Sequence, residues 1–320
     1  MTALHPGTAG TPGALDGGPL ADPALLGPLR PLLGELGDAK RVRVAGRTGS
    51  LAEQAFVRSW ARLVAGEPTD EVCATEVAAA VAAARLAGVD RHVLRAGGLD
   101  DAAATAVLTA SYDEVAGPLP AAERWRAALA VPVVPVPDAA ALPPSLVALV
   151  AQPRAGATAP GRARVVVEPP ESHGDHCWTV ALYGALLAPA VGADPAEAFL
   201  LGLAHHLHNA ALPDAGFAGE VLLGEHLEPV LRRFTEAALA ELPPALADLV
   251  RGLLLARDDA VAPLSQAFHA ADVLDRVLQV HHHARAAAFT VSQALDDLEL
   301  VHDGPVQGFH HRVLAGAGLW

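Results

Sequence analysis

The half of the chain that follows Asp175 carries apolar residues at helical spacing almost to its end. Apolar residues that recur every three or four positions form one face of an α-helix. Apolar residues make up 52% of the chain and aromatic residues only 4%. Ala, Leu and Val dominate, and the first two strongly favour helix. The sequence therefore predicts an all-α protein with an aliphatic core.

Segments rich in Pro and Gly divide the chain into parts. Residues 1–24 contain too few large apolar side chains to order themselves, so we expect a flexible tail there. Proline-rich or glycine-rich breaks over 131–144 and 152–161 interrupt helix formation. We therefore predict a helical region of unknown role over 25–152 and a second helical domain over 165–320. Within the second domain we expect helices near 176–188, 194–209, 226–240, 244–257, 264–297 and 305–315.

The charge and composition exclude several classes of function. The formal net charge is −14 and basic residues form no long runs, which argues against binding of extended nucleic acid. We expect no signal peptide, and the apolar runs are too short for a membrane span. The two cysteines, Cys73 and Cys177, form no Cys-x-x-Cys pair, which is typical of a reducing compartment. We expect a cytoplasmic protein, and the sequence leaves its oligomeric state open.

The histidines are distributed very unevenly. All but two of the 15 histidines follow residue 172. His176, His205 and His206 lie on two of the predicted helices, and Asp272 lies on a later one. Helices of a bundle can point such side chains into a common core, which is how helical proteins build metal centres. These four residues are therefore the predicted metal ligands.

The spacing of these residues resembles the HD superfamily of metal-dependent phosphohydrolases. That superfamily places a His on one helix, a His-Asp pair on the next and a distant Asp on a later helix. The resemblance covers the second half of the chain. Its three elements here are Asp175-His176-Cys177-Trp178-Thr179-Val180, the turn Gly192-Ala193-Asp194-Pro195 before His205, and Ala271-Asp272-Val273-Leu274-Asp275.

Two positions depart from the superfamily's pattern. His206 replaces the paired Asp, and Asn209 stands where Lys or Glu is common. Without the bridging carboxylate, a centre with one divalent metal ion is expected, and imidazole ligands favour Zn, Fe or Mn over Mg. The resemblance implies hydrolysis of a phosphomonoester or nucleotide. The alternative is a catalytically degenerate HD domain that binds a small ligand or a protein partner.

Other residues are candidates for supporting roles. Asp214 and Glu220, in the segment after the histidine pair, are candidates for the general acid–base. Arg276 and Arg285 follow Asp272 and are candidates for binding phosphate. A third hypothesis, a di-iron oxygenase of the same superfamily, requires further ligands, for which the candidates are His226 and His269.

The remaining histidines have simpler interpretations. We expect His173 in a loop before the first of these helices, and His208 at the surface after the second. His281, His282 and His283 are consecutive and would point around most of a helix, so we expect them to be exposed.

Overall fold

The computed structural model describes residues 18–131, 142–284, 290–297 and 299–320. Within these ranges extended backbone pairs only as isolated β-bridges, so the predicted all-α fold is confirmed. The α-helices are α1 (Pro23–Gly37), α2 (Leu51–Val64), α3 (Thr69–Leu86), α4 (Arg91–Ala96), α5 (Asp101–Val115), α6 (Ala122–Ala128), α7 (Pro144–Ala151), α8 (His173–Val191), α9 (Pro195–Ala204), α10 (Gly216–Leu223), α11 (Leu227–Leu239), α12 (Pro244–Ala256), α13 (Pro263–Ala284) and α14 (Gln307–Gly316). Short 3₁₀ helices are η1 (Gly18–Ala21), η2 (Asp38–Lys40), η4 (Leu207–Ala210) and η5 (Gly224–His226), and η6 (Gln293–Asp297) is a π-helix.

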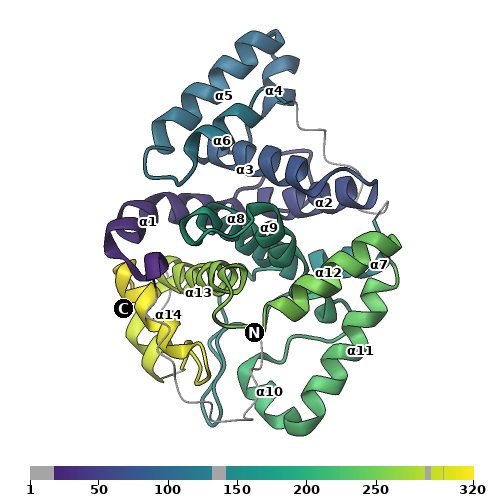
Figure 1. Ribbon diagram of the computed structural model, residues 1–320, viewed down its shortest axis with the longest axis vertical. Helices are drawn as coiled ribbons and strands as arrows, with labels where there is room; N and C mark the ends of the chain where they lie inside the picture. The colour runs from purple at the N-terminus through teal and green to yellow at the C-terminus, as the bar shows by residue number, and fades with distance from the viewer. Residues whose placement is uncertain (1–17, 132–141, 285–289, 298) are drawn as a thin grey trace.

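Helix α8 lies at the centre of the molecule, where it packs against α9, α13 and α2. Helices α3 to α6 form one end of the long axis, and α10 and α11 lie at the other (Figure 1). The buried apolar core is continuous between the two predicted regions, since Leu26, Trp60 and Leu182 belong to one cluster. None of the described helices is both long enough and apolar enough to cross a membrane.

The tail predicted at the start of the chain is ordered in its last residues. Leu20 in η1 is fully buried, and α1 begins at Pro23 with Asp22 as its N-cap. The prediction of a flexible tail is therefore wrong for residues 18–24, because the apolar Leu20 packs into the core. Residues 1–17 lie outside the described ranges.

Helix α8 is buried on all sides, whereas the helical spacing of apolar residues had predicted one buried face. Every residue from His173 to Ala188 is buried, and a helix that is apolar all round is typically a central one. It also begins earlier than predicted. Ser172 caps it and Asp175 completes a capping box, so His173 lies in the first turn and not in a loop.

A glycine allows α8 and α9 to come into close contact. A Cβ atom on Gly202 would lie 2.4 Å from the Cα atom of Ala181. No side chain fits between the two backbones at this point, so α9 can cross α8 here only because residue 202 is glycine. The crossing places the end of α9 beside the start of α8.

Helix α9 ends at Ala204, before the predicted boundary near residue 209. His205 is its C-cap, and the backbone of His206 has left the α-helical region. The ring of His205 contributes to this ending, because its Nδ1 lies 2.7 Å from the carbonyl oxygen of Gly202. That oxygen would otherwise accept the helical hydrogen bond of His206.

Candidate metal centre

His176 and His205 face one another in the core. The Nε2 atoms of the two imidazoles lie 3.2 Å apart, and both side chains are buried. The Oδ1 atom of Asp272 lies 3.4 Å from the Nε2 atom of His176. Helix α13 thus brings Asp272 against His176, and the end of α9 brings His205 against the same imidazole. Among the described residues, Asp272 does not belong to a group in which three ligand atoms share metal-ligand spacing.

The ring of His206 joins the same cluster. Its centroid lies 4.3 Å from that of His205 and 5.2 Å from that of His176. One nitrogen from each of the three rings lies within 4.8 Å of the other two, a spacing that allows a metal ion to bind all three. Adjacent residues of a regular helix point about 100° apart. His205 and His206 converge because the helix ends between them.

Each of the three imidazoles has a hydrogen-bond acceptor at Nδ1. The Nδ1 atom of His176 lies 2.7 Å from Oδ2 of Asp275, and that of His205 the same distance from the Gly202 carbonyl oxygen. The Nδ1 atom of His206 lies 2.7 Å from Oδ1 of Asn209. A neutral imidazole carries one proton, which these acceptors place on Nδ1. The lone pair of each ring is therefore on Nε2.

Burial keeps the three histidines neutral. It lowers the pKa of His176 to about 3, and the positive charge of Arg154 acts in the same direction. Burial also places the pKa values of His205 and His206 well below the ordinary value of histidine. Neutral imidazole is the form that binds metal ions.

Asp272 supplies the negative charge of the cluster. Burial opposes its ionisation, and the positive charge of Arg276 is the first of the influences that nevertheless hold the pKa of Asp272 well below its ordinary value. The Nη2 atom of Arg276 lies 3.4 Å from the Oδ2 atom of Asp272. Asp272 is therefore an ionised carboxylate with one oxygen toward His176 and the other toward Arg276.

These residues fit a divalent metal ion. Two imidazole nitrogens on one tetrahedral zinc ion lie about 3.3 Å apart, since each Zn–N bond is about 2.0–2.1 Å long. The Nε2 atoms of His176 and His205 lie 3.2 Å apart, and with Nδ1 protonated they present two lone pairs to each other. A cation between them would relieve this repulsion. Acceptors that hold the second nitrogen of each ring are typical of metal-binding histidines.

Sequence reasoning gave no role to four residues around this cluster. Lys40, Arg154, Glu171 and Asp275 form a network of ion pairs against His176. Asp275 belongs to the same motif as Asp272, and Lys40 is the only lysine of the chain, so the sequence itself set both residues apart. Arg154 and Glu171 lie in segments rich in Pro and Gly, where the sequence has no periodicity to place them.

The two predicted general acid–base residues differ in their surroundings. Both carboxylate oxygens of Asp214 accept backbone N–H groups, from Ala155 and Gly216, at 2.8 Å. Burial opposes its ionisation, but the charge of Arg154 and the hydrogen bond from Ala155 help to hold its pKa well below the ordinary value. Burial raises the pKa of Glu220 instead, and Arg276 and Arg154 are close enough to oppose that shift. A carboxyl group with a raised pKa is the better proton donor near neutral pH.

The two additional ligands that the oxygenase hypothesis requires lie in different parts of the structure. His226 is exposed at the end of η5, whereas His269 is buried beside Phe268 and His310. Neither belongs to a group of described residues with metal-ligand spacing. Arg285 lies outside the described residues.

Two predictions for the remaining histidines require correction, and the prediction for His208 is confirmed in part. His283 is buried and lies 3.0 Å from the amide nitrogen of Gln279, so the three consecutive histidines are not all exposed. His208 is only half-buried, and its ring lies 5.4 Å from that of His206. His173 is buried with its ring 5.0 Å from that of His206, because α8 begins at this residue.

A small cavity lies next to the cluster. Its volume is about 70 Å³, and its charged walls are Arg154, Glu171 and Arg276. The Nε atom of Arg276 is buried and has no hydrogen-bond partner among the described residues. The other walls are mainly aliphatic and include Val165, Val167, Val280, Ala294 and Leu300.

No family model, curated protein or solved structure matches the chain in sequence or fold.

Proposed function

We propose that the protein is a phosphohydrolase of the HD type with a single divalent metal ion, held by His176, His205, His206 and Asp272. The observation that carries this proposal is the pair of Nε2 atoms 3.2 Å apart, each on a ring whose Nδ1 has an acceptor. Three nitrogen ligands and one carboxylate suit Zn²⁺, Fe²⁺ or Mn²⁺.

The bound metal ion would supply a Lewis acid that polarises a phosphoryl oxygen and lowers the pKa of water. The chain's own residues would do the rest. Arg276 would bind the phosphate, because its buried Nε–H has no hydrogen-bond partner among the described residues, while its Nη2 atom lies 3.4 Å from Oδ2 of Asp272. A buried donor without a partner is costly, and an anionic oxygen would satisfy it. Arg154 also lines the cavity and adds a second positive charge.

Glu220 is the better candidate for the general acid that protonates the leaving group. Burial raises its pKa, and its carboxyl group lies within electrostatic reach of Arg154 and Arg276. Asp214 instead ties the segment before α10 to the backbone of Ala155. The cavity of about 70 Å³ has room for a phosphate group beside aliphatic side chains. This favours a small phosphomonoester as the substrate over a bulky one.

The proposal is tested by metal analysis joined to a phosphatase screen. Purified protein is stripped with chelator, reloaded separately with Zn²⁺, Mn²⁺ and Fe²⁺, and assayed for phosphate release from small phosphomonoesters and nucleotides. We expect one ion per chain and metal-dependent turnover, both lost in His205→Ala. The exposed His226→Ala is the matched control and should retain both. Bound metal without turnover would favour the degenerate binding module, and absence of metal from the folded wild type would refute the proposal.

A further inference from the structure

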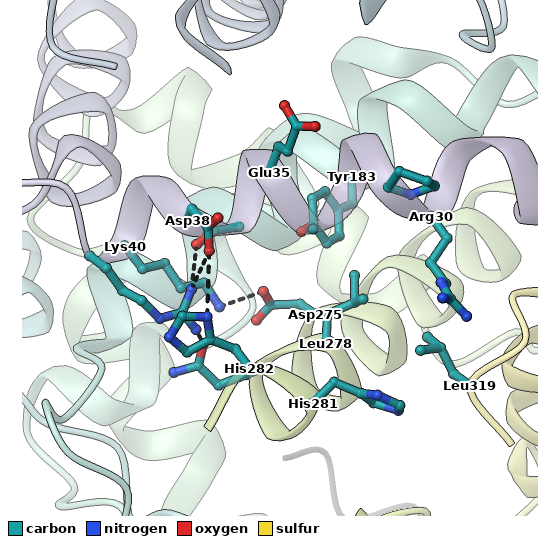
Figure 2. A pocket seen from close by; sticks show the side chains of 15 residues that line it. Arg30, Glu35, Asp38, Lys40, Tyr183, Asp275, Leu278, His281, His282 and Leu319 are labelled. Atoms are coloured by element: carbon teal, nitrogen blue, oxygen red, sulfur yellow. Dashed lines mark hydrogen bonds and ion pairs between the residues drawn. The ribbon is translucent and has the colours of Figure 1, made fainter. Parts of the chain in front are cut away.

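Lys40 is unusual among the basic residues of this chain. It is the only lysine, all other basic residues being arginine, and it is only 4% exposed. Its ammonium contacts Oδ1 of Asp275 and lies 3.1 Å from Oε2 of Glu171. Figure 2 shows Lys40 reaching from the segment after α1 to Asp275 on α13, in the wall of a cavity of about 360 Å³. A buried ammonium is costly unless it is paired, and here it has two carboxylate partners.

Asp275 connects Lys40 to the metal centre. Its Oδ1 atom accepts from Lys40, and its Oδ2 atom lies 2.7 Å from Nδ1 of His176. The acceptor at Nδ1 leaves the lone pair of His176 on Nε2, where it faces His205. The orientation of Asp275 therefore determines which nitrogen of His176 is available to a metal ion.

The same carboxylates form a second group with metal-ligand spacing. Ligand atoms of Glu171, His176 and Asp275 lie within 4.8 Å of one another. Unlike the three-histidine cluster, this group already contains a cation. The Lys40 ammonium contacts Glu171 and Asp275, and Arg154 lies 3.2 Å from the other oxygen of Glu171. A second metal ion at this position would have to displace a buried ammonium from two carboxylates.

We infer that Lys40 is a positioning residue whose ammonium takes the place of a second cation, which holds His176 as an Nδ1–H donor and limits the centre to one metal ion. The part of this inference that concerns metal stoichiometry rests on the proposed function. The part that concerns the proton on His176 stands without it. The inference also gives the N-terminal region a role, since η2 supplies a side chain that completes the surroundings of the centre.

The metal arm of the test uses Lys40→Met, Asp275→Asn and the double variant, with affinity measured by competition with a chromogenic chelator. Loss of a partner that orients a metal-binding histidine weakens metal affinity about 10–100-fold. We expect this loss in each single variant and no greater loss in the double variant, because Lys40 acts through Asp275. Arg30→Met, which removes a cation from the wall of the same cavity, is the matched control and should leave affinity unchanged. Unchanged affinity in Lys40→Met, or two tightly bound ions in the wild type, would overturn the inference.

The second arm needs no metal. Protein labelled with ¹⁵N-histidine is stripped of metal, and the His176 resonances are assigned by comparison with His176→Gln. We expect the Nδ1–H tautomer in the wild type and in Lys40→Arg, and its loss in Lys40→Met. The same tautomer in Lys40→Met would contradict a positioning role. If the wild type binds no metal but Lys40→Met changes the tautomer, the proposed function fails while the role of Lys40 stands. If Lys40→Met fails to fold, the measurement is made on Asp275→Asn instead, because we expect His176 to lose the Nδ1–H tautomer in that variant as well.

Discussion

Metal binding should stabilise this protein by an amount that can be calculated. The three neutral imidazoles reach metal-ligand spacing, with Asp272 against His176, only when α8, α9 and α13 are packed together, so the unfolded chain lacks the centre. At a free metal concentration 100 times the dissociation constant, binding to the folded state alone contributes about 2.7 kcal/mol. For a chain of 320 residues the unfolding entropy is roughly 0.7 kcal/mol/K. The melting temperature should therefore rise by about 4 °C.

The assay is differential scanning calorimetry of chelator-treated protein before and after titration with Zn²⁺. His205→Ala removes one proposed ligand and the hydrogen bond to the Gly202 carbonyl, so its starting melting temperature will differ from that of the wild type. The informative quantity is the shift that metal produces within each variant. We expect the shift to disappear in His205→Ala and to persist in His226→Ala. A wild-type shift below about 1 °C at saturating metal, or an equal shift in His205→Ala, would refute the reasoning.

Three further predictions follow from particular contacts. Gly202→Ala should destabilise the protein by about 3 kcal/mol or more in urea unfolding, because its Cβ would meet the backbone of Ala181; Gly252→Ala, in open space on α12, should stabilise it by up to about 1 kcal/mol. The metal-free wild type should lose stability as pH falls from 6.5, since each buried histidine with a lowered folded-state pKa contributes up to about 1.4 kcal/mol per pH unit. His205→Gln should reduce the slope of stability against pH by up to about 1.4 kcal/mol per pH unit, which corresponds to one proton. An unchanged slope would contradict a buried neutral His205. Glu220→Gln should lower kcat by about 10²–10⁴-fold while metal stays bound; equal turnover would exclude Glu220 as the general acid.

The sequence was sufficient to predict that His205 and Asp272 both approach His176, because the spacing of the three residues resembles that of the HD superfamily and each was expected on a helix. It could not decide the direction of His206. Regular helix geometry would turn adjacent residues about 100° apart, and only the early end of α9 makes His205 and His206 converge. Asn209 was recognised only as a departure from a motif, whereas in the structure it is the acceptor for His206.

The spacing of apolar residues could not predict contacts between residues that are far apart in the sequence. Lys40 and Asp275 are 235 residues apart, and nothing in the local sequence of either residue specifies the other. The burial of α8 on all sides has the same origin, since it depends on helices from both predicted regions packing around it. Local patterns determine which helices form, and the packing of distant helices determines what surrounds the cluster.

The charges of the centre connect its architecture to the chemistry that we propose. Its carboxylates are each paired with a basic side chain, Asp272 with Arg276, Asp275 with Lys40, and Glu171 with both Lys40 and Arg154. The imidazoles are neutral, so these side chains together carry no net charge. A divalent ion would therefore add two positive charges that the protein does not cancel. A phosphomonoester dianion would cancel them, and its oxygens would also satisfy the Nε–H of Arg276, which has no partner in the part of the chain that the structure describes. A neutral substrate would do neither, which is why we expect metal and phosphate to bind cooperatively.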